Sequence, residues 1–204
     1  MGAATKQVRD FTWAQIRRII TMKNEGERKA ALANLRSGAG CAPGEKPQLW
    51  GEFLLDMPEE MYSPSGEPSC AEWAVYTALT LFALHQQGKE PDSACMNVEG
   101  QSLGHAAARL VRDEEDRPRV WRRFGAVASA EDMRELAVYL RALVQLLRAE
   151  DIGLDYPGLA ADLFDYQHDS RRDRVRLRWG QDFYRRIERN DPENERTQEE
   201  NENE

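Results

Sequence analysis

The chain has 204 residues, enough for one sizeable hydrophobic core or two small ones, and 31% of its residues are charged, as in globular proteins with highly charged surfaces. The formal net charge is −8, but residues 188–204 hold eight acids and two bases and contribute −6 of it. The remainder is almost neutral, so the overall acidity does not exclude a nucleic-acid partner.

The cysteines and the start of the chain indicate a cellular compartment. Cys41, Cys70 and Cys95 lie far apart without a C-x-x-C pair, which is typical neither of a zinc knuckle nor of a disulfide framework. The first residues contain no apolar targeting segment, and no stretch is long and apolar enough for a membrane span. We therefore expect a cytoplasmic protein that does not associate with membranes.

Residues 1–100 are expected to form a first small helical domain. Apolar spacing predicts a helix over residues 12–23, with Trp13 on its apolar side, and a second helix over residues 27–36. Four glycines or prolines between residues 38 and 44 then interrupt regular structure. A short helix is predicted to restart at Trp50.

The centre of this domain is expected at residues 69–87. After Glu72 this stretch carries no charge until Lys89, and its apolar residues, Trp73 among them, point in all directions of a helical wheel. A helix that is apolar all round belongs in a protein interior. Ser69 and Glu72 have the spacing of a capping box, and Gly88 supplies the stop, so the pattern predicts a central buried helix.

Residues 101–189 are expected to form a second helical bundle, joined to the first by the polar stretch 88–101. The pattern predicts helices over residues 102–111, 118–124, 129–148 (capped by Ser129) and 155–163. Residues 174–179 alternate as a strand would, but apolar residues continue at i+4 to Ile187, which favours a helix. Residues 190–204 are expected to be a disordered acidic tail. The predicted fold class is therefore all-α, with two small helical domains.

Motifs for catalysis and metal binding are missing from the sequence. His85, His105 and His168 are not spaced at i, i+4 with another ligand type, and there is no G-x-S-x-G elbow or phosphate-binding G-x-x-x-x-G-K-[ST] loop. A helical hydrolase would need paired carboxylates or metal ligands, and neither is convincing here. We expect no enzymatic activity, no metal and no cofactor.

Arginine is the residue type that carries a functional signal. The chain has 23 arginines and 5 lysines, with clusters in residues 103–123 and 171–189. On a helical wheel of the last predicted helix, Arg171 and Arg178 fall on one side. An ordinary charged face with internal salt bridges remains an alternative. The preference for arginine favours phosphate, because the guanidinium fork matches its oxygens.

The order of motifs along the chain resembles the CasB family, the small subunit of the type I-E CRISPR surveillance complex, Cascade. The motifs that carry the resemblance are LRSGAGCAPGEKPQLW (35–50), ALTLFALHQQ (78–87), SLGHAAARL (102–110), WRRF (121–124), YLRALVQLLR (139–148), LDYPGLAADL (154–163) and VRLRWGQDFYR (175–185). The resemblance implies an all-α protein of two helical domains, without catalytic activity.

It also implies partners and a role. Two copies of such a subunit contact the backbone and large subunits of the CRISPR RNA-containing complex and help to hold the displaced single-stranded non-target DNA when the R-loop opens. Such a subunit needs no base-reading side chains, because pairing with the guide RNA reads the sequence. The arginines in matching motifs, together with the two from the last helix, give the predicted nucleic-acid-binding set: Arg36, Arg109, Arg112, Arg122, Arg123, Arg141, Arg171 and Arg178.

A second hypothesis is a purely structural helical adaptor whose arginines contact acidic protein surfaces. The salt dependence of single-strand binding separates the two, because phosphate contacts give a steep slope of log affinity against log salt.

Overall fold

The computed structural model describes residues 1–189, with side chains through Ile187, and this part of the chain is all-α, as predicted. The predicted disordered tail, residues 190–204, lies outside the described residues. The only β-type pairing among the described residues is an isolated bridge between Asn97 and Leu154. The helices are α1 (Ala3–Ile20), α2 (Glu25–Ser37), η1 (Pro47–Leu49), α3 (Trp50–Phe53), η2 (Glu59–Met61), α4 (Cys70–His85), α5 (Leu103–Ala108), α6 (Asp116–Ser129), α7 (Met133–Ala149), α8 (Tyr156–Tyr166) and α9 (Asp169–Arg189).

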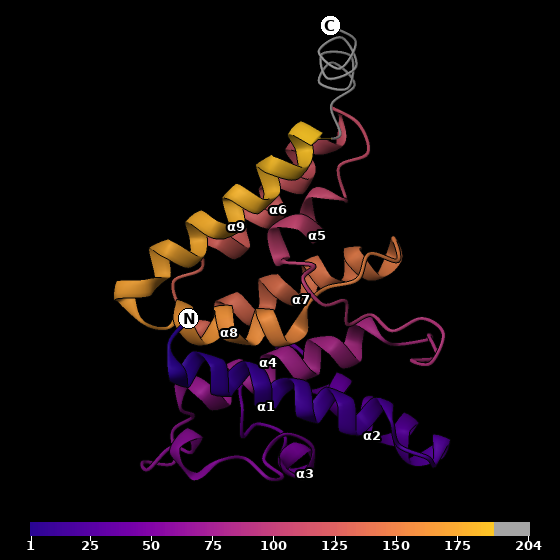
Figure 1. Ribbon diagram of the computed structural model, residues 1–204, viewed down its shortest axis with the longest axis vertical. Helices are drawn as coiled ribbons and strands as arrows, with labels where there is room; N and C mark the ends of the chain where they lie inside the picture. The colour runs from indigo at the N-terminus through magenta and orange to yellow at the C-terminus, as the bar shows by residue number, and fades with distance from the viewer. Residues whose placement is uncertain (190–204) are drawn as a thin grey trace, which may run out of the picture.

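Helix α4 is the central helix that the sequence predicts. The hydroxyl of Ser69 accepts a hydrogen bond from the Glu72 amide (3.0 Å), and the Glu72 carboxylate accepts one from the Ser69 amide (2.7 Å), which confirms the capping box. Thirteen residues of this 16-residue helix are buried. Helices α1, α2, α7 and α8 all pack on it, so α4 is enclosed on several sides (Figure 1). This enclosure explains why its sequence is apolar all round.

The remaining helices extend the structure away from α4. Figure 1 shows α7 and α8 above α4, with α5, α6 and α9 beyond them at the opposite end from α1 and α2. Helix α9 packs on α5 and α8 through Val175, Trp179 and Phe183, each at most 1% exposed. The prediction that residues 174–179 are helical is therefore confirmed. The i+4 apolar spacing reflects this buried face of α9.

The hydrophobic core runs without interruption from α1 to α9. Helix α8, from the second predicted domain, packs on α1 and α4 of the first. The stretch between α4 and α5 is tied down by Gln86, whose amide donates to the carbonyls of Lys89 and Ala94 (both 3.0 Å). The division into domains at residue 100 stays a prediction, but the elements on its two sides share a core.

Two sequence-based expectations about individual residues are wrong. Trp13, expected on the apolar side of the first helix, lies on the surface and is 44% exposed. Ser129 is the last residue of α6, and it is Asp132 that caps α7, by accepting from the Glu135 amide at 2.8 Å. The turn between these two helices is only three residues long, so α6 continues through Ser129 and the cap falls on the last residue of the turn.

Candidate nucleic-acid interface

Arg122 and Arg123 project from α6 into solvent. Both side chains are exposed, and none of the ion pairs formed by residues 1–187 includes either of them. The buried residues of α6 are Val120, Phe124 and Val127, at the helical spacing of one face. The two arginines lie off that face, so the fold of α6 places both guanidinium groups outside the core.

Arg141 lies on α7, against the glycine-rich segment that follows α2. A Cβ atom at Gly40 would lie 3.1 Å from Cδ of Arg141, so the arginine stem packs directly over the Gly40 backbone. Gly40 also has φ +83°, a conformation that favours glycine. Arg36, at the end of α2, is half-buried and precedes Gly40 by four residues. The structure thus brings together two motifs, 35–50 and 139–148, that are far apart in the chain.

Arg112 and Arg123 meet at a small cavity of about 90 Å³ between α6 and the end of α7. Its wall also includes Leu146 and Glu150, and the Glu150 carboxylate forms an ion pair with Arg112. Arg112 is therefore partly neutralised within the chain, whereas Arg123 is not. Leu146 lies five residues after Arg141, roughly 140° around α7. Arg141 therefore stands on the exposed face of α7, and Arg123 lies beside the flank of that helix where Leu146 is.

Arg109 lies apart from these residues, in a pocket of about 320 Å³ between α5 and α9. Arg185 and Arg186 of α9 and His105 of α5 line the same pocket. The one carboxylate there, Asp182, accepts a hydrogen bond from Ser102 Oγ (2.7 Å). Arg185 and Arg186 are absent from the predicted set, although the arginine content of α9 was a signal that could have identified them.

Arg171 and Arg178 have intramolecular partners. Arg171 Nη1 lies 2.6 Å from Asp165 Oδ1, and its guanidinium stands over the ring of Phe164. Arg178 pairs with Asp162, which also accepts a hydrogen bond from the buried Trp179 Nε1 at 2.6 Å. Arg171 and Arg178 thus form internal salt bridges, which is the alternative that the sequence left open.

The carboxyl group of Asp162 has a raised pKa because it is buried. Loss of hydration raises the pKa of this carboxyl to about 6, while Arg178 and the Trp179 N–H act in the opposite direction by stabilising the carboxylate. Because Asp162 and Asp165 come from α8 and the arginines from α9, these pairs fasten the two helices together.

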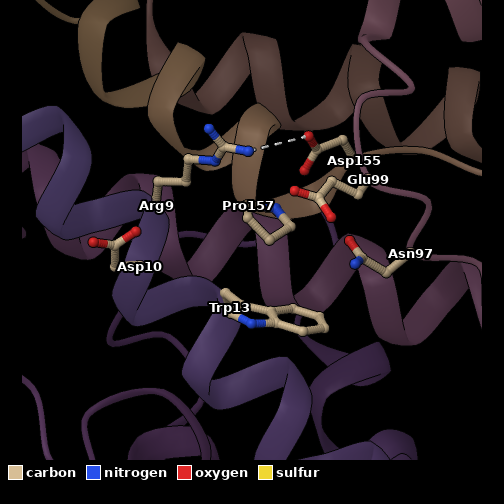
Figure 2. Close-up of a pocket in the computed structure, with 7 residues that line it drawn as sticks. All are labelled: Arg9, Asp10, Trp13, Asn97, Glu99, Asp155 and Pro157. Carbon is tan, nitrogen blue, oxygen red and sulfur yellow. Dashed lines mark ion pairs between the residues drawn. The ribbon is translucent and has the colours of Figure 1, made fainter. Parts of the chain in front are cut away.

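A further cavity, of about 220 Å³, lies between α1 and the start of α8 (Figure 2). It is lined by Arg9, Asp10, Trp13, Asn97, Glu99, Asp155 and Pro157. Across this cavity, Nη2 of Arg9 lies 3.9 Å from Oδ2 of Asp155. The Asp155 carboxylate also caps α8. Three carboxylates against one guanidinium disfavour a phosphate here.

Among residues 1–189 no three or more His, Cys, Asp or Glu side chains come together in a way that could hold a metal ion. Within the same range, no helix has the length and apolar character needed to cross a membrane.

The sequence and the fold of the chain were compared with those of known proteins. The sequence model described as CRISPR-associated protein Cse2 matches residues 31–184. Among solved structures, CasB from Thermobifida fusca is 33% identical, with 87% of this chain and 97% of that chain covered and a TM-score of 0.71. No curated protein sequence matches the chain significantly.

More distant structures share the fold. A Cse2-family CRISPR-associated protein from Thermus thermophilus is 23% identical, with 90% and 99% of the two chains covered and a TM-score of 0.65. CasB from M. ruber is also 23% identical, with 88% and 95% covered and a TM-score of 0.65. With most of its length matched by the family model, the chain belongs to the CRISPR-associated Cse2 (CasB) family, as its motif order predicts.

Proposed function

We propose that this chain is the non-catalytic small subunit of a CRISPR RNA-guided surveillance complex, in which it holds the displaced non-target DNA strand and bridges neighbouring subunits. The observation that carries the proposal is the exposure and lack of ion-pair partners, within residues 1–187, of Arg122, Arg123 and Arg141, here called the α6–α7 arginines. All three are exposed, and no carboxylate among the described residues pairs with them. A guanidinium left free in this way is available for an external anion.

Phosphate is the anion that best fits these side chains. A guanidinium offers a planar fork of donors that matches two phosphate oxygens, and backbone contacts of this kind do not depend on base sequence. In RNA-guided recognition, pairing with the guide reads the sequence, and the protein needs only to support the backbone and the displaced strand. Free arginines on a helical scaffold meet that requirement without a catalytic group.

The partners of such a subunit follow from family membership. We propose the CRISPR RNA-containing Cascade complex with its backbone and large subunits, a second copy of this chain within the complex, and single-stranded non-target DNA. The cytoplasm is the proposed location. Arg36 and Arg109, which also form no ion pair among the described residues, are proposed as additional phosphate contacts.

The test is the triple variant Arg122→Ala/Arg123→Ala/Arg141→Ala in the assembled complex. We expect it to fold and to co-purify with the other subunits, but to hold an opened R-loop for a shorter time in strand-protection assays. For single-stranded DNA, the slope of log affinity against log salt should flatten by about 0.7 per lost contact, about 2 in total.

A matched control removes three positive charges elsewhere. Lys6, Arg17 and Lys29 on α1 and α2 are exposed, and their triple alanine variant changes the net charge by the same amount. This control should keep the wild-type salt slope. If the α6–α7 variant instead fails to assemble while binding single strands normally, these arginines contact protein, and the structural adaptor hypothesis replaces the proposal.

A further inference from the structure

The seam between α6 and α9 exposes two aromatic side chains that contact each other. Trp121 is 43% exposed and Tyr184 41% exposed, and their ring centroids lie 5.5 Å apart. In Figure 1 the two helices run alongside each other. Apolar residues scattered singly over a surface are common, but two exposed aromatic rings in contact form a local apolar patch that a ligand can use.

The aromatic pair rests on a rigid base. Beneath it Phe124 and Phe183 are stacked, with centroids 5.0 Å apart and planes inclined by 16°, and both rings are at most 1% exposed. Trp121 also contacts Phe183, at 5.6 Å. A ligand that stacks on Trp121 or Tyr184 would therefore find rings that are already held in place, which lowers the entropic cost of binding.

Positive charge surrounds the pair. The guanidinium of Arg117 lies 6.0 Å from the centroid of the Tyr184 ring, and Arg122 directly follows Trp121 on α6. One carboxylate opposes them, Glu114, at 3.5 Å from Arg117, but it is 81% exposed and its pairing is screened by water. Aromatic rings next to arginines are the combination that proteins use for single-stranded nucleic acids.

Two glycines lie one helical turn from the aromatic pair. Gly125 follows Trp121 by four residues on α6, and Gly180 precedes Tyr184 by four residues on α9. The helices are antiparallel, because Arg176 donates to the Ala130 carbonyl while Trp121 contacts Tyr184. The two glycines are therefore at the same level of the seam.

These glycines are not explained by packing within the chain. A glycine in a helix interior costs about 1 kcal/mol relative to alanine, so a close approach usually accounts for it. A Cβ atom at either position would meet no atom within 4 Å. The open space beside the aromatic pair is thus available to a molecule from outside.

We propose that Trp121 and Tyr184 form a stacking site for unpaired bases of single-stranded nucleic acid, with Gly125 and Gly180 as the floor over which the strand passes. The inference rests on the proposed function and deepens it, since it names the residues that would contact the bases. The site is continuous with the α6–α7 arginines through Arg122. Arginines would hold the phosphates, and the two rings would hold the bases without reading their sequence.

The experiment compares two probes on the full chain: an oligo-dT strand of about 20 nucleotides, longer than the site of a single binding module, and a strand of the same length made of abasic residues. Both carry the same phosphates, but only the first can stack. Wild-type protein should bind oligo-dT more tightly. Trp121→Leu should weaken oligo-dT binding by about 5- to 150-fold, the range for loss of one stacked base, and should leave abasic binding and the salt slope unchanged.

Two further variants control this result. Trp121→Phe keeps an aromatic face and should recover most of the affinity for oligo-dT. Trp50→Leu removes a tryptophan that is similarly exposed but lies on α3, away from the seam, and should bind both probes as wild type does.

The glycines provide a test that does not depend on removing an aromatic side chain. Gly125→Ala/Gly180→Ala should raise the melting temperature by a few degrees, because alanine favours the helix and meets no clash. The same variant should bind oligo-dT about 5-fold more weakly or worse, since its methyl groups occupy the floor.

The outcomes separate this inference from the proposed function. Equal binding of both probes by wild type would overturn the stacking site while leaving the phosphate-binding role in place. Binding of neither probe would overturn both. If the Trp121 or glycine variants keep their affinity for oligo-dT but no longer enter the complex, the seam is a protein interface, and the stacking site is wrong.

Discussion

The sharpest stability prediction concerns Gly104, where α5 crosses α9. A Cβ atom at this position would overlap the Trp179 carbonyl oxygen and lie 2.8 Å from Asp182 Cβ and 3.0 Å from the Phe183 amide nitrogen. The obstructing atoms include backbone, and Trp179 is fixed because its buried indole N–H donates to Asp162. In Gly104→Ala, α5 must therefore move away from α9 as a unit.

The magnitude follows from two opposing effects. Overpacking of a filled interface costs about 1–3 kcal/mol, and a clash with backbone belongs at the upper end of that range. Alanine regains about 1 kcal/mol through its helix propensity, which leaves a net loss of about 2 kcal/mol. For a protein of this size the melting temperature should then fall by about 4–8 °C.

Thermal unfolding followed by circular dichroism measures the effect. Gly180→Ala is the matched control, since it makes the same substitution on the partner helix at an open position, and it should melt at or slightly above the wild-type temperature. A Gly104→Ala variant as stable as wild type would refute the close contact between α5 and α9.

Two predictions concern buried polar groups. Burial lowers the pKa of His85 from 6.5 to about 4. On acidification from about pH 7.5 to about pH 5, the unfolded state therefore takes up a proton at His85 and the folded state does not. The free energy of unfolding should fall by about 2 kcal/mol over this range. Urea unfolding of wild type and of His85→Gln at both pH values measures this loss, which should be absent in the variant. Asp162 has a raised pKa and shifts the stability in the opposite direction, but it does so equally in both proteins and cancels when they are compared. Asp162→Ala should cost about 1–3 kcal/mol, because it leaves the indole N–H of Trp179 without an acceptor, and Asp162→Asn, which keeps an acceptor oxygen, should cost less in the same assay.

Family-wide motifs and helical periodicity were enough to predict much of this protein. The all-α class, the buried central helix with its Ser69 cap, and the helix that contains residues 174–179 are confirmed, because each depends on how a segment satisfies its own backbone and aligns its own apolar residues. These are local properties. They do not depend on which other helix comes to lie alongside.

The tertiary structure decided what local pattern could not. Arg171 and Arg178 look like Arg122 and Arg123 in the sequence, yet only the first pair meets carboxylates, because α8 brings Asp165 and Asp162 next to α9.

The same holds for the aromatic residues. Trp73 lies in the most apolar helix of the chain but is only partly buried against the core, whereas Trp179, surrounded by arginines in sequence, is fully buried. Periodicity tells which residues of a helix share a face. The number of neighbouring helices that cover that face is set by the packing of segments far apart in the chain, and this is what determined which arginines and which aromatic rings remain free on the surface.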